Sequence, residues 1–323
     1  MRIRFDPELR WQEAWAEGAA EVEGILDGSC EEDGEQVLLA RFEDPVLVTD
    51  PWRIGQLEPR KRDVVNAFFG RSHRIVEYDS VTIDFDQTKY PRVWSPSVDT
   101  LLLCRAIRGL QEALSGARTV LEIGCGSGYL ALYTMVSRAR LGQPLDDVHV
   151  VDIEPQAVAC AMGALEAQSG GTVVSASLGR RGEALRVRGG YDLILMNPPY
   201  IRRPPELTEA RYQDNPWEGV ALIREMAERG RQFLNPGGSL LMMVSSLCDD
   251  LVVPWLESSF DVSEVDAMEV PLKVYSVTSG LTAKSRAWIR FLKESEGLML
   301  YDAPRDGYDV WHRLRVLRCR ARS

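Results

Sequence analysis

Short apolar runs alternate with longer amphipathic stretches through most of this chain. Several runs are apolar throughout, which is typical of strands buried on both faces of a parallel sheet. Strands are predicted at residues 118–123, 148–151, 172–177, 191–196, 239–245, 262–270 and 309–318. Helical stretches are predicted between them at residues 129–139, 155–168 and 250–258. This alternation of strands and helices predicts an α/β fold.

The first 72 residues carry a different pattern. We expect a helix over Asp6–Asp27 with an apolar face, a strand or two over Gln36–Val48, and a second helix over Glu58–Phe69. A hairpin follows, in which residues 74–78 and 81–85 are joined by Asp79-Ser80. The pattern therefore predicts a small α+β segment over residues 1–90 and a main domain over residues 91–323.

The last two predicted strands are separated by an insertion at residues 279–307, which contains a predicted helix over Lys284–Glu296. An insertion at this place is either an element of substrate specificity or an elaboration of the surface, and the sequence supports both interpretations.

The predicted strand 191–196 runs directly into Asn197-Pro198-Pro199-Tyr200. Each proline fixes φ and removes a donor, so this loop is rigid and offers mainly acceptors. Oxygen atoms that bind the hydrogens of a planar NH2 group favour its pyramidal transition state, and Tyr200 could stack on the plane. All four residues are therefore candidate catalytic residues for chemistry at a planar nitrogen. The alternative is a proline-rich turn with no chemical role.

The strand 118–123 leads into Gly124-Cys125-Gly126-Ser127-Gly128. Glycines at alternate positions let a ligand approach the backbone. A dinucleotide fingerprint would need its third glycine at position 129, which is Tyr129. Glu122 also argues against phosphate and is expected near a cation, such as the sulfonium and ammonium of S-adenosylmethionine. The alternative is a generic glycine-rich turn.

Two further acids are candidates for contacts with a nucleoside. Asp152 ends the predicted strand 148–151 and could accept hydrogen bonds from both ribose hydroxyls, or it could cap the next helix, as could Glu154. Glu183 could accept from an adenine amino group, or it is a solvated charge among nearby arginines.

The order and spacing of the glycine loop, Asp152 and the Asn-Pro-Pro-Tyr loop resemble those of class I S-adenosylmethionine-dependent methyltransferases that act on planar nitrogens. Within this class, residues 96–103 and 217–223 look like segments of the HemK-type protein-glutamine N5-methyltransferases. The resemblance covers approximately residues 73–270. It implies a doubly wound, seven-stranded, mostly parallel sheet with S-adenosylmethionine as cofactor. The residues expected to contact that cofactor are Thr100, Glu122, Gly124, Cys125, Gly126, Ser127, Gly128, Asp152, Ile153, Glu183, Ala184 and Asn197.

The resemblance leaves the methyl acceptor open, because the same tetrapeptide occurs in enzymes that methylate adenine N6 and cytosine N4, and a close variant occurs in ribosomal RNA enzymes that methylate guanine N2. The first 72 residues do not repeat the N-terminal helical bundle of HemK-type enzymes that act on release factors. A protein glutamine is the favoured acceptor, and a nucleic-acid base or a small-molecule nitrogen is the alternative. A non-enzymatic cofactor-binding module would have no use for acceptors aimed at a reacting nitrogen.

Charge also favours a protein or small-molecule substrate. The formal net charge of −10 opposes nonspecific attraction to a polyanion. Arg202 and Arg203 follow Tyr200 and could contact a substrate carboxylate or phosphate. A basic series near the C-terminus is expected to protect the edge of the sheet, with a nucleic-acid groove as the alternative, and consists of Arg313, Arg315, Arg318, Arg320 and Arg322.

Composition is that of a cytoplasmic enzyme. The chain has 323 residues, 45% of them hydrophobic, and its start lacks the apolar core of a signal peptide. The longest apolar run, near residues 240–244, is too short to span a membrane, so no membrane partner is expected. The six cysteines show no Cys-x-x-Cys spacing, so we expect neither a disulfide framework nor a metal site.

Overall fold

The computed structural model describes residues 2–5, 27–32, 35–41, 73–86, 88–179, 190–202, 219–271, 290–294, 297–305 and 308–322. The predicted helices at 6–27 and 58–69 lie outside these ranges, apart from Asp27. Asp27 is the first residue of a strand, β2 (Asp27–Glu32), and does not end a helix. β2 pairs with β3 (Glu35–Arg41), which falls at the start of the strand predicted over 36–48.

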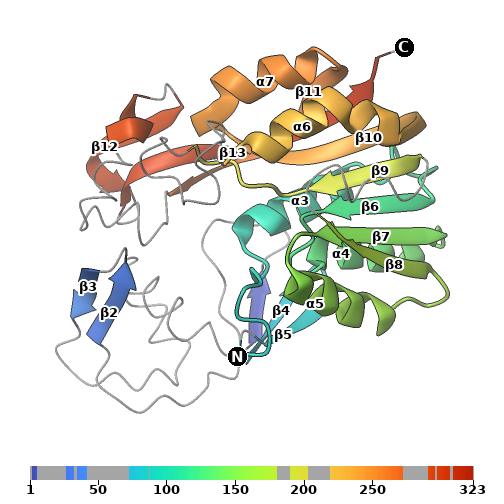
Figure 1. The fold of residues 1–323 in the computed structure, drawn as a ribbon, viewed down its shortest axis with the longest axis horizontal. Helices are drawn as coiled ribbons and strands as arrows, with labels where there is room; N and C mark the ends of the chain where they lie inside the picture. The colour runs from blue at the N-terminus through green and yellow to red at the C-terminus, as the bar shows by residue number, and fades with distance from the viewer. Residues whose placement is uncertain are drawn as a thin grey trace.

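The main sheet contains the seven strands that the sequence predicted. They are β6 (Thr119–Ile123), β7 (Asp147–Asp152), β8 (Val173–Leu178), β9 (Tyr191–Met196), β10 (Leu234–Ser245), β11 (Phe260–Pro271) and β13 (Tyr308–Ala321). Their spatial order is β11-β13-β10-β9-β6-β7-β8 (Figure 1). The strands β10, β9, β6, β7 and β8 are mutually parallel. β13 is antiparallel to both β10 and β11. The predicted doubly wound, mostly parallel sheet is therefore confirmed.

Two details differ from the prediction. An eighth strand, β12 (Leu298–Arg305), lies in the predicted insertion and pairs with the first half of β13. The glycine pair Gly237-Gly238 directly precedes the predicted strand 239–245 but lies within β10, where the register with β9 shifts between Leu234 and Ser239.

Helices cover both faces of the sheet (Figure 1). One face packs against α3 (Val98–Gly109), α4 (Tyr129–Arg140) and α5 (Pro155–Glu166), and the other packs against α6 (Ala221–Arg229) and α7 (Asp249–Glu257). Successive residues of a strand point to opposite faces, so Leu193 and Leu195 join the first core while Ile194 and Met196 join the second. Burial on both faces explains why β9 is apolar along its length.

Two short 3-10 helices complete the described elements of this region: η4 (Gly230–Phe233) precedes β10 and η5 (Ser246–Cys248) follows it. No helix among the described residues is long and apolar enough to cross a membrane.

The predicted hairpin is confirmed as β4 (His73–Tyr78) and β5 (Val81–Asp86). Its turn residues Asp79 and Ser80 both have positive φ, at 49° and 58°, as a tight two-residue hairpin turn requires. The hairpin packs on α4, where the Tyr129 hydroxyl donates to the Val81 carbonyl at 2.8 Å. A short strand, β1 (Arg2–Phe5), pairs parallel to β4.

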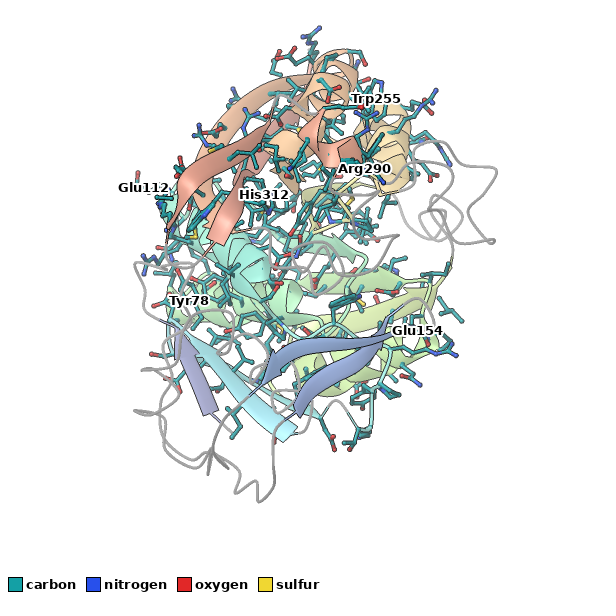
Figure 2. All side chains as sticks on the ribbon, turned by 90° about the vertical axis from the view of Figure 1, so that its left-hand side faces the viewer. Tyr78, Glu112, Glu154, Trp255, Arg290 and His312 are labelled. Atoms are coloured by element: carbon teal, nitrogen blue, oxygen red, sulfur yellow. The ribbon has the colours of Figure 1, made fainter. Side chains whose placement is uncertain are left out.

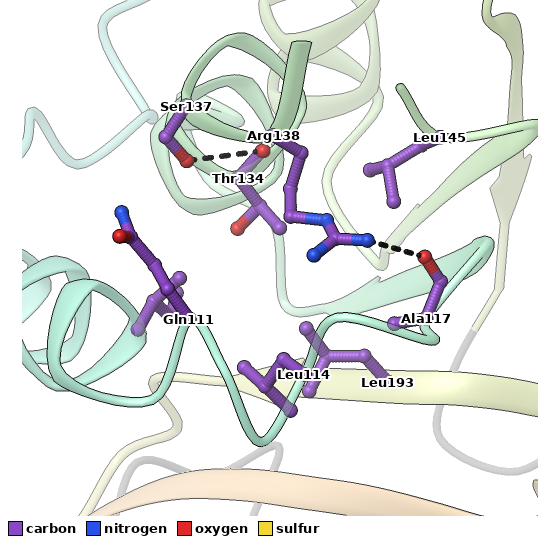
Figure 3. Close-up of a pocket in the computed structure, with 9 residues that line it drawn as sticks. Gln111, Leu114, Ala117, Thr134, Ser137, Arg138, Leu145 and Leu193 are labelled. Atoms are coloured by element: carbon purple, nitrogen blue, oxygen red, sulfur yellow. Dashed lines mark hydrogen bonds between the residues drawn. The ribbon is translucent and has the colours of Figure 1, made fainter. Parts of the chain in front are cut away.

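Two polar contacts fix α3 and α4 in the fold. The Arg105 guanidinium binds both carboxylate oxygens of Asp266, at 2.8 and 2.7 Å, and so joins α3 to β11. The buried Arg138 of α4 donates to the carbonyl of Ser115 and to that of Ala117, just before β6, and Figure 3 shows the contact with Ala117. The cavity beside Arg138 measures only about 10 Å³, which is room for about one water. It is too small for a substrate, so we assign Arg138 a structural role.

Candidate functional site

The loop Asn197-Pro198-Pro199-Tyr200 leaves the carboxyl end of β9, beside the central strand β6. Pro198 is buried, Pro199 is exposed, and Asn197 and Tyr200 are partly buried. The carboxyl ends of parallel strands are where open α/β sheets bind ligands. The structure therefore places the predicted catalytic loop at the ligand-binding edge of the sheet.

The side-chain amide of Asn197 has a defined orientation. Its Nδ2 donates to Asp99 Oδ2 at 3.1 Å and to Thr100 Oγ1 at 3.3 Å. Its Oδ1 is buried and has no hydrogen-bond partner among the described residues. A buried acceptor without a partner costs free energy in the folded state, so it calls for an explanation.

The hydroxyl of Tyr200 donates to the same oxygen, Asp99 Oδ2, at 2.9 Å. Burial, together with the neighbouring carboxylate, raises the pKa of Tyr200 well above its ordinary value, so the phenol stays protonated and continues to donate. The Tyr200 ring also lies 6.5 Å from the ring of His312, which is labelled in Figure 2. Tyr200 is thus bound to α3 through its hydroxyl and lies near β13 through its ring.

Asp99 was not among the candidate site residues from the sequence. It lies in the first turn of α3, where Ser97 and Thr100 form a capping box, and that box was the available sequence signal. What the sequence could not show is that its carboxylate meets residues 98 and 101 positions further along the chain.

The glycine loop between β6 and α4 has the backbone that glycine permits. Gly124, Gly126 and Gly128 have φ values of 69°, 51° and 76°. A Cβ on Gly128 would lie 2.6 Å from Ala161 Cβ, so this glycine lets α5 approach the start of α4. A Cβ on Gly124 would meet nothing within 4 Å. The loop is therefore open at its first glycine and tightly packed at its last.

Glu122 lies beneath this loop and is 2% exposed. Its Oε2 accepts a hydrogen bond from the backbone N–H of Ala131, in the first turn of α4, at 2.9 Å. Burial raises the pKa of Glu122 to about 8, in spite of that hydrogen bond. A nearby cation would stabilise the charged form of this acid.

Asp152 touches the glycine loop directly. Its Oδ2 accepts from the Gly126 N–H at 3.0 Å, and its Oδ1 accepts from the Glu154 N–H at 2.9 Å. The N-cap of α5 is Glu154, whose side chain accepts from the Gln156 N–H, so of the two capping alternatives only that for Glu154 is confirmed. Glu154 is labelled in Figure 2.

The remaining candidates divide into those near the loop and those outside the described part of the chain. Cys125 and Ser127 are buried within the loop, and Ile153 is 59% exposed beside Asp152. Glu183, Ala184 and Arg203 lie outside the described residues. The structure thus brings Thr100 to Asn197, and Asp152 to the glycine loop.

The predicted role of the C-terminal arginines as edge protection is wrong, because β13 pairs with β10 on one side and β11 on the other. Arg313 and Arg315 bind Glu264, and Arg315 also binds Asp249, each at 2.6 Å. These arginines neutralise acids of their own sheet and helix, which argues against the alternative of a nucleic-acid groove.

The described part of the insertion packs beside the candidate catalytic loop. Leu292 is buried against Leu247, and Ile201, the residue after Tyr200, packs on the same cluster. Arg202 lies over the ring of Phe291, at 5.5 Å from its centre, and pairs with Asp250 at 3.4 Å. The described part of the insertion is therefore next to the residues that follow Tyr200.

The sheet order, with one antiparallel strand between β10 and β11, defines the class I methyltransferase fold. The chain belongs to the family described as the methyltransferase small domain, whose family model matches residues 100–276, more than half of the 323 residues. It is therefore a methyltransferase.

Curated relatives are similar over parts of their length. Methyltransferase HEMK2 of Mus musculus is 29% identical over 150 residues, 45% of this chain and 68% of that protein. The release factor glutamine methyltransferase of Bordetella pertussis is 34% identical over 161 residues, 47% of this chain and 56% of that protein. Ribosomal RNA small subunit methyltransferase C of Yersinia pestis is 24% identical over 162 residues, 50% of this chain and 40% of that protein.

Proposed function

We propose that this chain is an S-adenosylmethionine-dependent N-methyltransferase whose acceptor is a planar amide or amine nitrogen, with a protein glutamine side chain as the favoured acceptor. The observation that carries the proposal is the orientation of Asn197. Its Nδ2 is bound to Asp99 and Thr100, while its buried Oδ1 is left without a partner among the described residues. An NH2 group is the complement of that oxygen.

Three features of the glycine loop fit S-adenosylmethionine. The open space at Gly124 leaves room for a ligand against the backbone. The buried acid Glu122 would gain from a cationic ligand, and Asp152, already at the loop, has lone pairs left for ribose hydroxyls. When bound, this cofactor supplies an electrophilic methyl group on a sulfonium.

The residues of the chain contribute by orienting the acceptor nitrogen. An amide nitrogen shares its lone pair with the carbonyl and is a poor nucleophile. Asn197 Oδ1 and the Pro198 carbonyl would bind its two hydrogens in a pyramidal arrangement, which returns the lone pair to nitrogen as the transition state forms. Because Oδ1 is buried, this contact forms inside a desolvated site, where an electrostatic interaction is strengthened.

Several observations support a protein acceptor. The Bordetella pertussis relative is named as a release factor glutamine methyltransferase. The net charge of −10 and the pairing of Arg313 and Arg315 with acids oppose binding of a polyanion. We also propose that residues 91–323 form the methyltransferase domain with residues 1–90 as an accessory segment. The insertion at 279–307, whose Leu292 packs in one cluster with Ile201, would then shape the entry of the methyl acceptor.

The test of the acceptor class uses purified protein, methyl-labelled S-adenosylmethionine and a cell extract separated into protein, nucleic acid and small molecules. The Asn197→Ala variant supplies the background. We expect label in protein, and acid hydrolysis should release it as methylamine, since the modified amide is hydrolysed to glutamate. Label in nucleic acid alone, dependent on Asn197, would overturn the protein acceptor and favour an exocyclic base amine, as the name of the Yersinia pestis relative would suggest.

A further inference from the structure

The carboxylate of Asp99 accepts hydrogen bonds from four groups. Its Oδ2 receives the Asn197 amide at 3.1 Å and the Tyr200 hydroxyl at 2.9 Å. Its Oδ1 receives the backbone N–H of Thr100 at 2.8 Å and the hydroxyl of Ser97. We propose that Asp99 is the positioning residue that holds the Asn197 amide with its oxygen, and not its nitrogen, toward the methyl acceptor. This inference rests on the proposed function.

The two ends of an asparagine amide have nearly the same shape and opposite hydrogen-bonding character. Rotation of the Asn197 amide by half a turn would place Oδ1 against Asp99 Oδ2, so two acceptors would face each other at about the 3.1 Å of the present contact. The same rotation would present an N–H donor to an incoming NH2 group, which is itself a donor. A carboxylate, which when ionised can only accept, therefore selects the productive orientation.

The position of Asp99 is fixed by the fold and not by the loop that it orients. Asp99 is in the first turn of α3, where the helix dipole and free backbone N–H groups favour negative charge. Leu101, Leu102 and Leu103 of the same helix are fully buried, and Arg105 anchors α3 to Asp266. The core thus holds the carboxylate, and the carboxylate holds the loop.

The central test exchanges the donor and the acceptor of the contact. In Asp99→Asn, the new amide cannot accept hydrogen bonds from all four donors. The side chain at position 99 then no longer favours one orientation of the Asn197 amide over the other. We expect turnover to fall by about 100-fold while affinity for S-adenosylmethionine changes by less than about threefold. In Asn197→Asp, two carboxylates face each other. The double variant Asp99→Asn, Asn197→Asp again pairs one hydrogen-bond donor with one hydrogen-bond acceptor, and it leaves an oxygen facing the methyl acceptor. Its turnover should therefore be at least about tenfold above that of Asp99→Asn.

The outcomes separate this inference from the proposed function. If Asn197→Ala keeps full activity, the proposed function fails. If Asn197→Ala is inactive while Asp99→Asn retains wild-type turnover, or the double variant recovers nothing, only the role of Asp99 is overturned.

A second measurement covers the case in which Asp99→Asn does not fold. Asn197→Asp keeps Asp99, and its activity should rise as pH falls from about 8 to about 6, because one shared proton relieves the repulsion between the carboxylates. The other titratable groups facing this contact among the described residues are Tyr200, Cys248 and His312. Their pKa values are raised well above 10, raised to about 12 and lowered to about 4, so all stay neutral in that range. An Asn197→Asp variant with the activity and pH profile of the wild type would overturn the inference.

Discussion

Glu122 accepts a hydrogen bond from the backbone N–H of Ala131 at 2.9 Å, so a buried acid sits against the first turn of α4. The turn favours the ionised acid, but desolvation by burial is the larger effect and raises the pKa of Glu122 from 4.5 to about 8. In the folded chain without ligand, this acid is mostly protonated at neutral pH.

Stability should therefore fall between about pH 6.5 and pH 8. Because the folded pKa of Glu122 is above the unfolded value, its contribution is complete below pH 4.5 and is lost as pH rises through about 8. We expect the free energy of unfolding to decrease by up to about 1.4 kcal/mol per pH unit in this window. His312, whose pKa is lowered to about 4, makes stability depend on pH only below about pH 6.5, which sets the lower limit of this window. Urea titrations should show a flatter profile for Glu122→Gln, and equal slopes would contradict the assignment.

The glycine loop provides a matched pair of substitutions. Gly124 and Gly128 have similar positive φ values, 69° and 76°, but only Gly128 would place a Cβ against Ala161, at 2.6 Å. We expect Gly124→Ala to cost about 1 to 2 kcal/mol of backbone strain. Gly128→Ala should cost a further 1 to 3 kcal/mol, roughly, from overpacking between α4 and α5. Thermal unfolding of both variants measures the difference, and equal losses would show that the contact with Ala161 is unimportant.

Asp152 and Glu154 can be separated by calorimetry. Asp152→Ala should weaken S-adenosylmethionine binding by about 2 kcal/mol, since it removes the proposed ribose partner and the acceptor of the Gly126 N–H. Glu154→Ala removes the cap of α5 and an exposed ion pair with Arg92, so it should lower stability by about 1 kcal/mol and leave affinity nearly unchanged. Unchanged affinity in Asp152→Ala would exclude the ribose role.

Local patterns predicted the centre of the sheet well because β6, β7, β9 and the second half of β10 are buried on both faces. The strand 191–196 was predicted with its observed ends, since an apolar run followed by Asn197-Pro198 can hardly continue. The hairpin turn at Asp79-Ser80 was equally clear. These elements are specified by residues close together in the sequence.

Features that depend on distant parts of the chain were missed. β10 ends at Ser245, opposite Leu314, so the start of β13 has no partner from β10. β12 takes that place, and its Leu298 pairs with His312. The error about the C-terminal arginines has a related cause, since the sequence does not show that the last strand inserts between two others.

In the candidate site, too, local motifs were predicted and contacts between distant residues were missed. The loop residues at the ends of β6 and β9 were recognisable from local motifs, and the structure places both motifs at one edge of the sheet. The orientation of Asn197 was beyond prediction, because it depends on a contact with Asp99 across 98 residues. Whether an asparagine presents an oxygen or an N–H group is decided by its neighbours in space.

The most direct test of the central claim is the rate of methyl transfer in a single turnover by Asn197→Ala, measured at saturating S-adenosylmethionine and compared with the affinity for that cofactor. We predict a rate about 100-fold to 1,000-fold below that of the wild type, with affinity within about threefold, because the change removes an acceptor used in the transition state. A variant that transfers the methyl group at the wild-type rate would contradict the account.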